Sequence, residues 1–89
     1  MPQVRIPTPL RPHADGRDVV EARGSTVGEV LGDLGTQYPA LRDRIFEGAE
    51  LRRFVNVYVN NEDIRYLEDL ETAVGDKDEV SIIPAVAGG

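Results

Sequence analysis

The fold is decided by Arg53-Phe54-Val55-Asn56-Val57-Tyr58-Val59-Asn60, in which three valines alternate with aromatic and amide side chains. A period of two residues is typical of a strand with one buried face. The valines form the core face, because they are the purely apolar set. The other face is then open to solvent or to a partner protein, and it carries Phe54, Asn56, Tyr58 and Asn60.

Downstream, the chain is predicted to turn at residues 60–63 and to return as a short strand over residues 64–66. The acidic connection that follows contains three side chains predicted to reach the core: Leu67, Leu70 and Val74. After a turn at residues 75–78, alternation resumes over residues 79–84. This pattern predicts a final strand with Val80 and Ile82 pointing inward.

Upstream, the first residues also alternate, and the pattern predicts a strand whose inward side chains are Val4, Ile6, Thr8 and Leu10. The dipeptide Asp15-Gly16 is a strong turn signal. Residues 17–23 then read as a second strand, with Val20 and Ala22 inward. Together the two segments predict an N-terminal hairpin.

One main helix is predicted between the hairpin and the valine strand. Thr26 can cap it, with Glu29 completing a capping box. Its apolar stripe is Val27, Val30, Leu31, Leu34 and Tyr38. Pro39 is expected to end the helix, and its glycines are expected to allow close packing against a sheet. Residues 40–50 predict a short helical turn and a loop around Gly48.

These elements predict an α+β fold in which a mixed sheet of about five strands packs on one main helix. With 89 residues, a single domain is expected. We expect residues 1–84 to form that domain and residues 85–89 to form a flexible C-terminal tail.

Composition excludes several classes of protein. The chain has no Cys, so neither a disulfide framework nor a Cys-based metal site is available. The net charge is −6, all of it from residues 45–89, which argues against nucleic acid and anionic membranes as partners. Without an apolar run that could span a membrane or direct secretion, a cytoplasmic protein is expected. An acidic surface suits a basic partner, although solubility explains it equally well.

The sequence ends in Ala85-Val86-Ala87-Gly88-Gly89. Glycines have no Cβ, so Gly88 and Gly89 can lie in a channel too narrow for any side chain. Nothing crowds the last carbonyl carbon, so another protein could bring a nucleotide or a sulfur donor to it. We hypothesise that the chemistry happens on Gly89, with residues 85–88 in a partner's channel. The alternative is that the terminus is merely frayed.

The chain resembles the ubiquitin-like sulfur carrier proteins, the ThiS and MoaD family, whose fold is the β-grasp. The resemblance covers the whole length, through the element order, the run Gly75-Asp76-Lys77-Asp78-Glu79-Val80 and the terminal glycines. The CysO-type carriers of bacterial cysteine biosynthesis are the most similar subgroup. The residues behind that closer resemblance are 53–60, Glu62-Asp63 and 84–89.

The resemblance implies a co-substrate and not an enzyme. An ATP-dependent adenylyltransferase of the ubiquitin-activating type would adenylate Gly89, and a sulfur donor would then displace AMP to leave a thiocarboxylate. A PLP-dependent enzyme similar to cysteine synthase would accept the sulfur, and a metalloprotease would release cysteine. The carrier itself would bind no cofactor or metal, since ATP and PLP belong to the partners.

Several alternatives remain at this point. The same tail could serve thiamin, molybdopterin or natural-product thiolation, or belong to a ubiquitin-like modifier or a plain binding module. Phe54 and Tyr58 could dock the activating enzyme or only pack across strands. His13, the one histidine, is interpreted as structural, and acid–base work by Asp76 and Asp78 is not expected.

Overall fold

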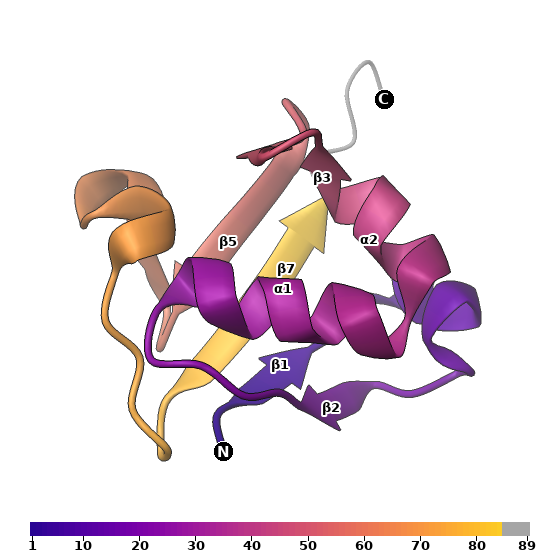
Figure 1. The fold of residues 1–89 in the computed structure, drawn as a ribbon, viewed down its shortest axis with the longest axis horizontal. Helices are drawn as coiled ribbons and strands as arrows, with labels where there is room; N and C mark the ends of the chain where they lie inside the picture. The colour runs from indigo at the N-terminus through magenta and orange to yellow at the C-terminus, as the bar shows by residue number, and fades with distance from the viewer. Residues whose placement is uncertain (85–89) are drawn as a thin grey trace.

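A five-stranded mixed sheet with strand order β2-β1-β7-β5-β6 packs against one long helix (Figure 1). The computed structural model describes residues 1–84. The strands are β1 (Gln3–Arg5), β2 (Val19–Glu21), β5 (Val55–Val59), β6 (Glu62–Asp63) and β7 (Glu79–Pro84). β1 and β7 are parallel neighbours at the centre, and the other pairs are antiparallel. The predicted α+β sheet-on-helix fold is confirmed.

The main helix α1 (Val27–Gln37) lies across the sheet, and a second helix α2 (Pro39–Ile45) follows after a sharp change of direction (Figure 1). A small hairpin of β3 (Phe46–Glu47) and β4 (Glu50–Leu51) leads into β5. Short 3₁₀ helices fill the connections: η1 (Thr8–Ala14), η2 (Ile64–Tyr66) and η3 (Asp69–Glu71).

The core lies between the sheet and the two helices. The predicted inward residues of β2 and β7 and the predicted stripe of α1 are buried, apart from half-buried Tyr38. α2 adds two fully buried side chains, Leu41 and Ile45. The other buried apolar residues are Val4, Ile6, Ala14, Val57, Val59, Ile64 and Val74. Burial of each large side chain contributes about 1.5–3 kcal/mol, so this cluster is the main source of stability.

The capping prediction for α1 is confirmed with one change. The Glu29 N–H donates to Thr26 Oγ1 at 3.2 Å, which satisfies one of the free donors of the first turn. The Glu29 carboxylate, however, accepts from the Ser25 N–H at 2.9 Å and the Ser25 hydroxyl at 3.0 Å. These hydrogen bonds lower the pKa of Glu29. The box therefore closes one residue earlier than expected.

The first strand is shorter than predicted. β1 ends at Arg5, and Thr8 and Leu10 lie in the 3₁₀ helix η1. Prolines at positions 7, 9 and 12 cause the difference, because proline has no N–H for a ladder and its fixed φ suits a tight helical turn. Leu10 still packs against the core from within η1. Its inward side chain was therefore predicted correctly, whereas its strand conformation was not.

Pro39 begins a helix and does not simply end one. It occupies the first turn of α2, where its missing N–H costs nothing. The predicted short turn is a seven-residue helix. Gly48 lies in the β3–β4 turn with a φ of 66°, which suits glycine.

The strand that returns after β5 lies two residues earlier than the predicted strand over residues 64–66. Glu62 and Asp63 pair with β5, and residues 64–66 form η2. The Asp63 side chain accepts the Arg65 N–H at 2.9 Å and so starts a helical turn in place of a strand. Consequently Ile64 enters the core, and Leu67, predicted to be buried, is 39% exposed.

Two of the three glycines of α1 pack closely against other segments, but not against the sheet as predicted. A Cβ added at Gly35 would lie 2.8 Å from the Arg42 Cβ in α2, and one at Gly28 would lie 3.2 Å from the Leu70 carbonyl oxygen. A Cβ at Gly32 would meet nothing within 4 Å. Gly35 therefore permits the α1–α2 contact, whereas Gly32 has no such function.

We predict opposite effects for the same substitution at two positions of α1. Gly32→Ala should raise the free energy of unfolding by about 1 kcal/mol, the difference in helix propensity. Gly35→Ala should lower it, because α2 must move to accommodate the methyl group. Urea denaturation followed by circular dichroism measures both, and equal stabilisation by both substitutions would show that α1 and α2 are not closely packed.

Candidate functional site

The tail begins where the central strand β7 ends. Pro84, the last described residue, lies opposite Val55 of β5. The predicted reactive residue Gly89 and the predicted channel residues Ala85, Val86, Ala87 and Gly88 lie outside the described residues. The part of the candidate site within residues 1–84 is the root of the tail, around Pro84.

A tail-end hollow of about 790 Å³ adjoins Pro84. Its apolar lining is Leu10, Phe54, Val55 and Pro84, and its charged lining is Asp43, Arg44, Glu47, Arg52 and Arg53. Phe54 belongs to the turn before β5, not to the strand, and is 52% exposed. An exposed aromatic ring thus lies beside the point from which the tail departs.

Ile83 is a candidate that sequence reasoning missed. It lies opposite the predicted docking residue Asn56 in the β5–β7 ladder, and it is 45% exposed. The signal was present, because an inward Val80 and Ile82 leave Ile83 on the outer face, one residue before Pro84. A single exposed isoleucine is common on protein surfaces, so Ile83 is a candidate only because it lies one residue before Pro84, at the root of the tail.

Tyr58 lies away from the tail, in a far hollow that it shares with Asp63, Arg65 and Tyr66. Asp63 is buried, and its Oδ2 accepts a hydrogen bond from Arg65 Nη2 at 2.7 Å. The side-chain hydrogen bond from Arg65 is the main cause that lowers the pKa of Asp63. Tyr66 is 87% exposed, so this end also presents an aromatic ring.

Asn60 supports a turn. Its φ is 49°, its amide nitrogen donates to Asp78 Oδ1 at 2.8 Å, and its amide oxygen accepts the Glu79 N–H at 2.9 Å. The other oxygen of Asp78 accepts the Gly75 N–H at 2.7 Å. These bonds lower the pKa of the Asp78 carboxyl, with the Gly75 N–H as the larger cause. Asn60 thereby ties the end of β5 to the start of β7.

The four predicted docking residues therefore do not form one patch. Phe54 lies at the tail root, Asn56 lies beside Ile83, and Tyr58 and Asn60 lie at the distal end of β5. Phe54 and Tyr58 are four residues apart, or about 13 Å along an extended chain. Partner docking by these side chains stays a prediction.

Within residues 1–84, no group of three or more His, Cys, Asp or Glu side chains is placed to hold a metal ion. Nor does any helix in that part of the chain combine the length and apolar character needed to cross a membrane.

The two carboxylates of the turn before β7 have structural partners. Asp78 accepts the hydrogen bonds from Asn60 and Gly75 described above, and Asp76 Oδ1 lies 3.5 Å from the N-terminal amine.

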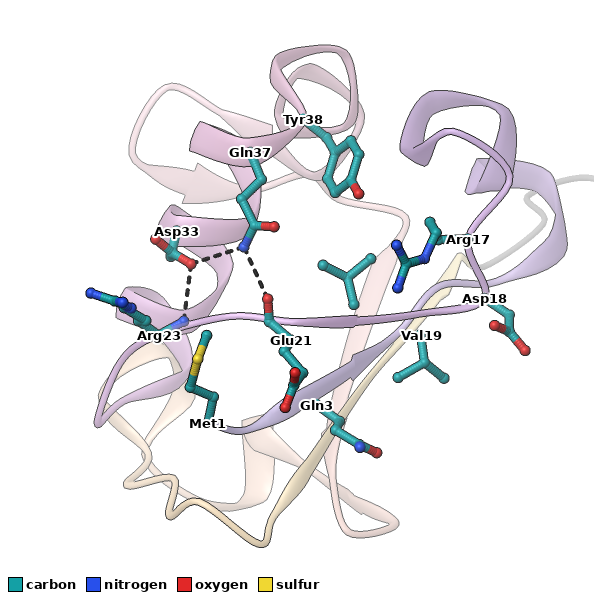
Figure 2. A pocket seen from close by; sticks show the side chains of 11 residues that line it. Met1, Gln3, Arg17, Asp18, Val19, Glu21, Arg23, Asp33, Gln37 and Tyr38 are labelled. Carbon is teal, nitrogen blue, oxygen red and sulfur yellow. Dashed lines mark hydrogen bonds between the residues drawn. The ribbon is translucent and has the colours of Figure 1, made fainter.

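A third hollow, the edge hollow, lies between β2 and the C-terminal half of α1 (Figure 2). It measures about 860 Å³. Asp33 Oδ2 accepts the Arg23 N–H at 3.0 Å, and Gln37 Nε2 donates to both Asp33 Oδ2 and the Glu21 carbonyl at 3.0 Å. The first of these bonds is the main cause that lowers the pKa of Asp33. This hollow is separated from the tail strand by β1, so we do not assign it to the tail chemistry.

The sequence is similar to known proteins along nearly its whole length. The ThiS family profile matches residues 4–89. The chain is 48% identical to the sulfur carrier protein CysO of Mycobacterium tuberculosis (strain ATCC 25618 / H37Rv), over 97% of this chain and 96% of the relative. It is 42% identical to small archaeal modifier protein 3 of Haloferax volcanii, over 73% of this chain and 71% of the relative.

Solved structures show the same fold. A chain in the crystal structure of the Amycolatopsis orientalis BexX/CysO complex matches with a TM-score of 0.92 and 45% identity, over 100% of both chains. The crystal structure of Mycobacterium tuberculosis CysO matches with a TM-score of 0.87 and 45% identity, over 97% of this chain and 100% of that one.

The lowered carboxyl pKa values predict how stability depends on pH. Glu29, Asp33, Asp63 and Asp78 all have lowered pKa values in the folded chain. The folded state then binds fewer protons than the unfolded state, whose carboxyl groups titrate near pH 4. Their contribution should be complete above about pH 5 and should be lost as the pH falls through the folded pKa values.

Urea unfolding across pH 2–7 measures this dependence. Asp78→Asn should make the acid decline less steep, since one of the linked protons is removed. Glu50→Gln is the matched control, since it removes an exposed carboxylate for which residues 1–84 record no side-chain hydrogen bond or ion pair. A wild-type unfolding free energy that does not fall in acid would contradict the prediction.

Proposed function

The chain belongs to the ThiS family, and from that premise we propose that it carries sulfur as a thiocarboxylate on Gly89 and delivers it for cysteine synthesis. It is a sulfur carrier protein and not an enzyme. The observation that carries the proposal is the 48% identity to CysO over nearly the full length of both chains. The family match extends through Gly88 and Gly89.

The proposed chemistry has two steps on the terminal carboxyl group. A Gly89 carboxylate oxygen attacks the α-phosphorus of ATP, pyrophosphate leaves, and an acyl adenylate forms. A sulfide-level donor then attacks the acyl carbon, AMP leaves, and the thiocarboxylate remains. Carboxylates are poor acyl donors and acyl adenylates are good ones, so the nucleotide supplies the activation. We assign ATP to an adenylyltransferase of the ubiquitin-activating type.

Delivery requires further partners. We assign the acceptor step to a PLP-dependent enzyme similar to cysteine synthase, and the release of cysteine to a metalloprotease. These partners operate in the cytoplasm, where ATP is available. The BexX/CysO complex is a precedent for a carrier of this type in contact with another protein. Neither a nucleic acid nor a membrane is part of the proposal.

The length of the tail limits where a partner must dock. Five residues beyond Pro84 span at most about 17 Å. A partner that brings a nucleotide to Gly89 must therefore cover the tail root, where Phe54, Asn56 and Ile83 lie. Tyr58 would be reached only by a partner that covers the whole length of β5.

A second candidate function is a protein modifier, favoured by the 42% identity to small archaeal modifier protein 3. A modifier would end in an isopeptide bond to a lysine of another protein, whereas a carrier ends in a thiocarboxylate. The product of the activated tail separates the two.

We expect Gly89 to gain sulfur when the chain is incubated with its activating enzyme, ATP and sulfide. Intact mass and C-terminal peptide mass, after trapping with a thiol-alkylating reagent, detect the exchange of oxygen for sulfur. The chain has no Cys, so the trap reports only the new group. A variant lacking Gly89 is the control and should stay unmodified. A chain that remains a plain carboxylate under these conditions refutes the proposal, and a protein adduct supports the modifier.

Docking at the tail root predicts the effects of three substitutions. Phe54→Ala and Ile83→Ala should each lower kcat/KM for thiocarboxylate formation by roughly tenfold, because central apolar contacts dominate interfaces. Tyr66→Ala removes an aromatic ring that is more exposed but lies in the far hollow, and it should have little effect. The reverse order would place the docking surface at the distal end.

A further inference from the structure

β2 forms one edge of the sheet, and its outer side has a definite hydrogen-bonding pattern. The Ile6 N–H donates to the Asp18 carbonyl, and the Ala22 N–H donates to the Pro2 carbonyl. Bonds in an antiparallel ladder alternate, so Val20 also faces β1, and Val19 and Glu21 turn their backbone groups outward. The bond from Gln37 to the Glu21 carbonyl confirms that this side faces away from β1.

The outer side of β2 is satisfied at its ends and open in the middle. Gln37 covers the Glu21 carbonyl and Asp33 covers the Arg23 N–H (Figure 2). At the other end, the Arg17 N–H donates to the Ala14 carbonyl at 2.9 Å. Among the bonds recorded in residues 1–84, none uses the N–H or carbonyl of Val19 or the N–H of Glu21 on this side.

Such an edge accepts an antiparallel strand, and its charges select which strand fits. A complementary strand needs an acid opposite Arg17, an apolar residue opposite Val19 and a base opposite Glu21. The chain itself provides this order when a second copy is related by a two-fold axis through Val19. Arg17 then faces Glu21 of the other copy, and Val19 faces Val19.

We propose that two copies of the chain associate through β2 in this register and form one continuous sheet. The two Val19 residues exchange a pair of hydrogen bonds, and each Glu21 N–H donates to the Arg17 carbonyl of the other copy. In a regular ladder the Arg17 N–H would also donate to the Glu21 carbonyl of the other copy. Here these two groups are already hydrogen-bonded within each copy, to the Ala14 carbonyl and to the Gln37 side chain. If the register shifted by two residues, Arg17 would lie opposite Arg23 of the other copy. The repulsion between these like charges disfavours that register.

The distribution of charge permits this contact in spite of the net charge. Residues 60–79 carry eight acidic and two basic side chains, which equals the whole net charge of −6. The two acids of β6, Glu62 and Asp63, lie at the opposite edge of the sheet from β2, about 19 Å away for four strand spacings. Their repulsion between the two copies is screened by distance, whereas Asp76, Asp78 and Glu79 share a hollow with Glu21 and lie nearer the contact.

Arg17 has the freedom that the contact requires. Its side chain is exposed, and none of the ion pairs recorded in residues 1–84 includes it. The tail strand β7 is separated from β2 by β1, so the association leaves both tail roots accessible. The proposal is therefore independent of the sulfur chemistry and can fail without affecting it.

A charge exchange tests the register. Arg17→Glu alone and Glu21→Arg alone each place like charges opposite each other twice, because of the two-fold symmetry. Each should weaken association by roughly tenfold or more. An equimolar mixture of the two single variants restores both opposite-charge pairs and should associate as the wild type does, as should the double variant Arg17→Glu/Glu21→Arg.

Sedimentation velocity from micromolar to millimolar protein measures these equilibria. A contact of one short strand is far smaller than a standard interface, so the wild-type Kd is expected near the millimolar end. Circular dichroism confirms that the exposed substitutions leave the fold intact. A wild type that stays monomeric at millimolar concentration overturns the proposal. It is equally overturned if the single variants associate like the wild type or if their mixture fails to recover.

Discussion

The parallel pairing of β1 with β7 is the constraint on which the rest of the structure depends. Val4 lies opposite Val80 at the centre of the sheet, and both side chains are fully buried. Since the two strands run in the same direction and come from the two ends of the chain, everything between them must cross over the sheet and return. The helix α1 makes that crossing and covers the core. At the other end of β7, Pro84 lies opposite Val55 of β5, so the tail starts from the end of a central strand.

The sequence predicted the parts of this fold in which local pattern and tertiary burial agree. The valine alternation of β5, the stripe and cap of α1 and the inward pair of β7 were all recognised correctly. The prediction was wrong where proline is compatible with two different backbone conformations. Proline occurs in edge strands as well as in 3₁₀ helices, and at positions 7, 9 and 12 it lies in or beside the 3₁₀ helix η1, which packs against α2. Pro39 could end one helix or begin the next.

The candidate site divides in the same way. The terminal glycines and the resemblance predict the tail as the site, which lies outside the described residues. Alternation alone grouped Phe54 with Asn60, although one lies at the tail root and the other holds a turn. A strand pattern tells which face a side chain is on and not how far along the strand it meets other elements. Ile83 was missed although alternation places it on the outer face of β7; what alternation does not tell is that it lies opposite Asn56 of β5. Cross-strand neighbours depend on the register, which the sequence does not specify by itself.

The net charge is unevenly distributed along the molecule, and this bears on how a carrier meets several partners. The acidic segment 60–79 lies around the distal ends of β5 and β7, whereas residues 1–59 contain equal numbers of acidic and basic side chains. Long-range attraction therefore acts mainly at the end away from the tail, where it can orient an approaching molecule. With a partner docked at the tail root as proposed above, burial of Phe54 and Ile83 would add a short-range apolar contribution beside the charged side chains that line the same hollow. Such a division would suit a carrier that must bind, react and leave, because the field speeds encounter while a small contact keeps each complex short-lived.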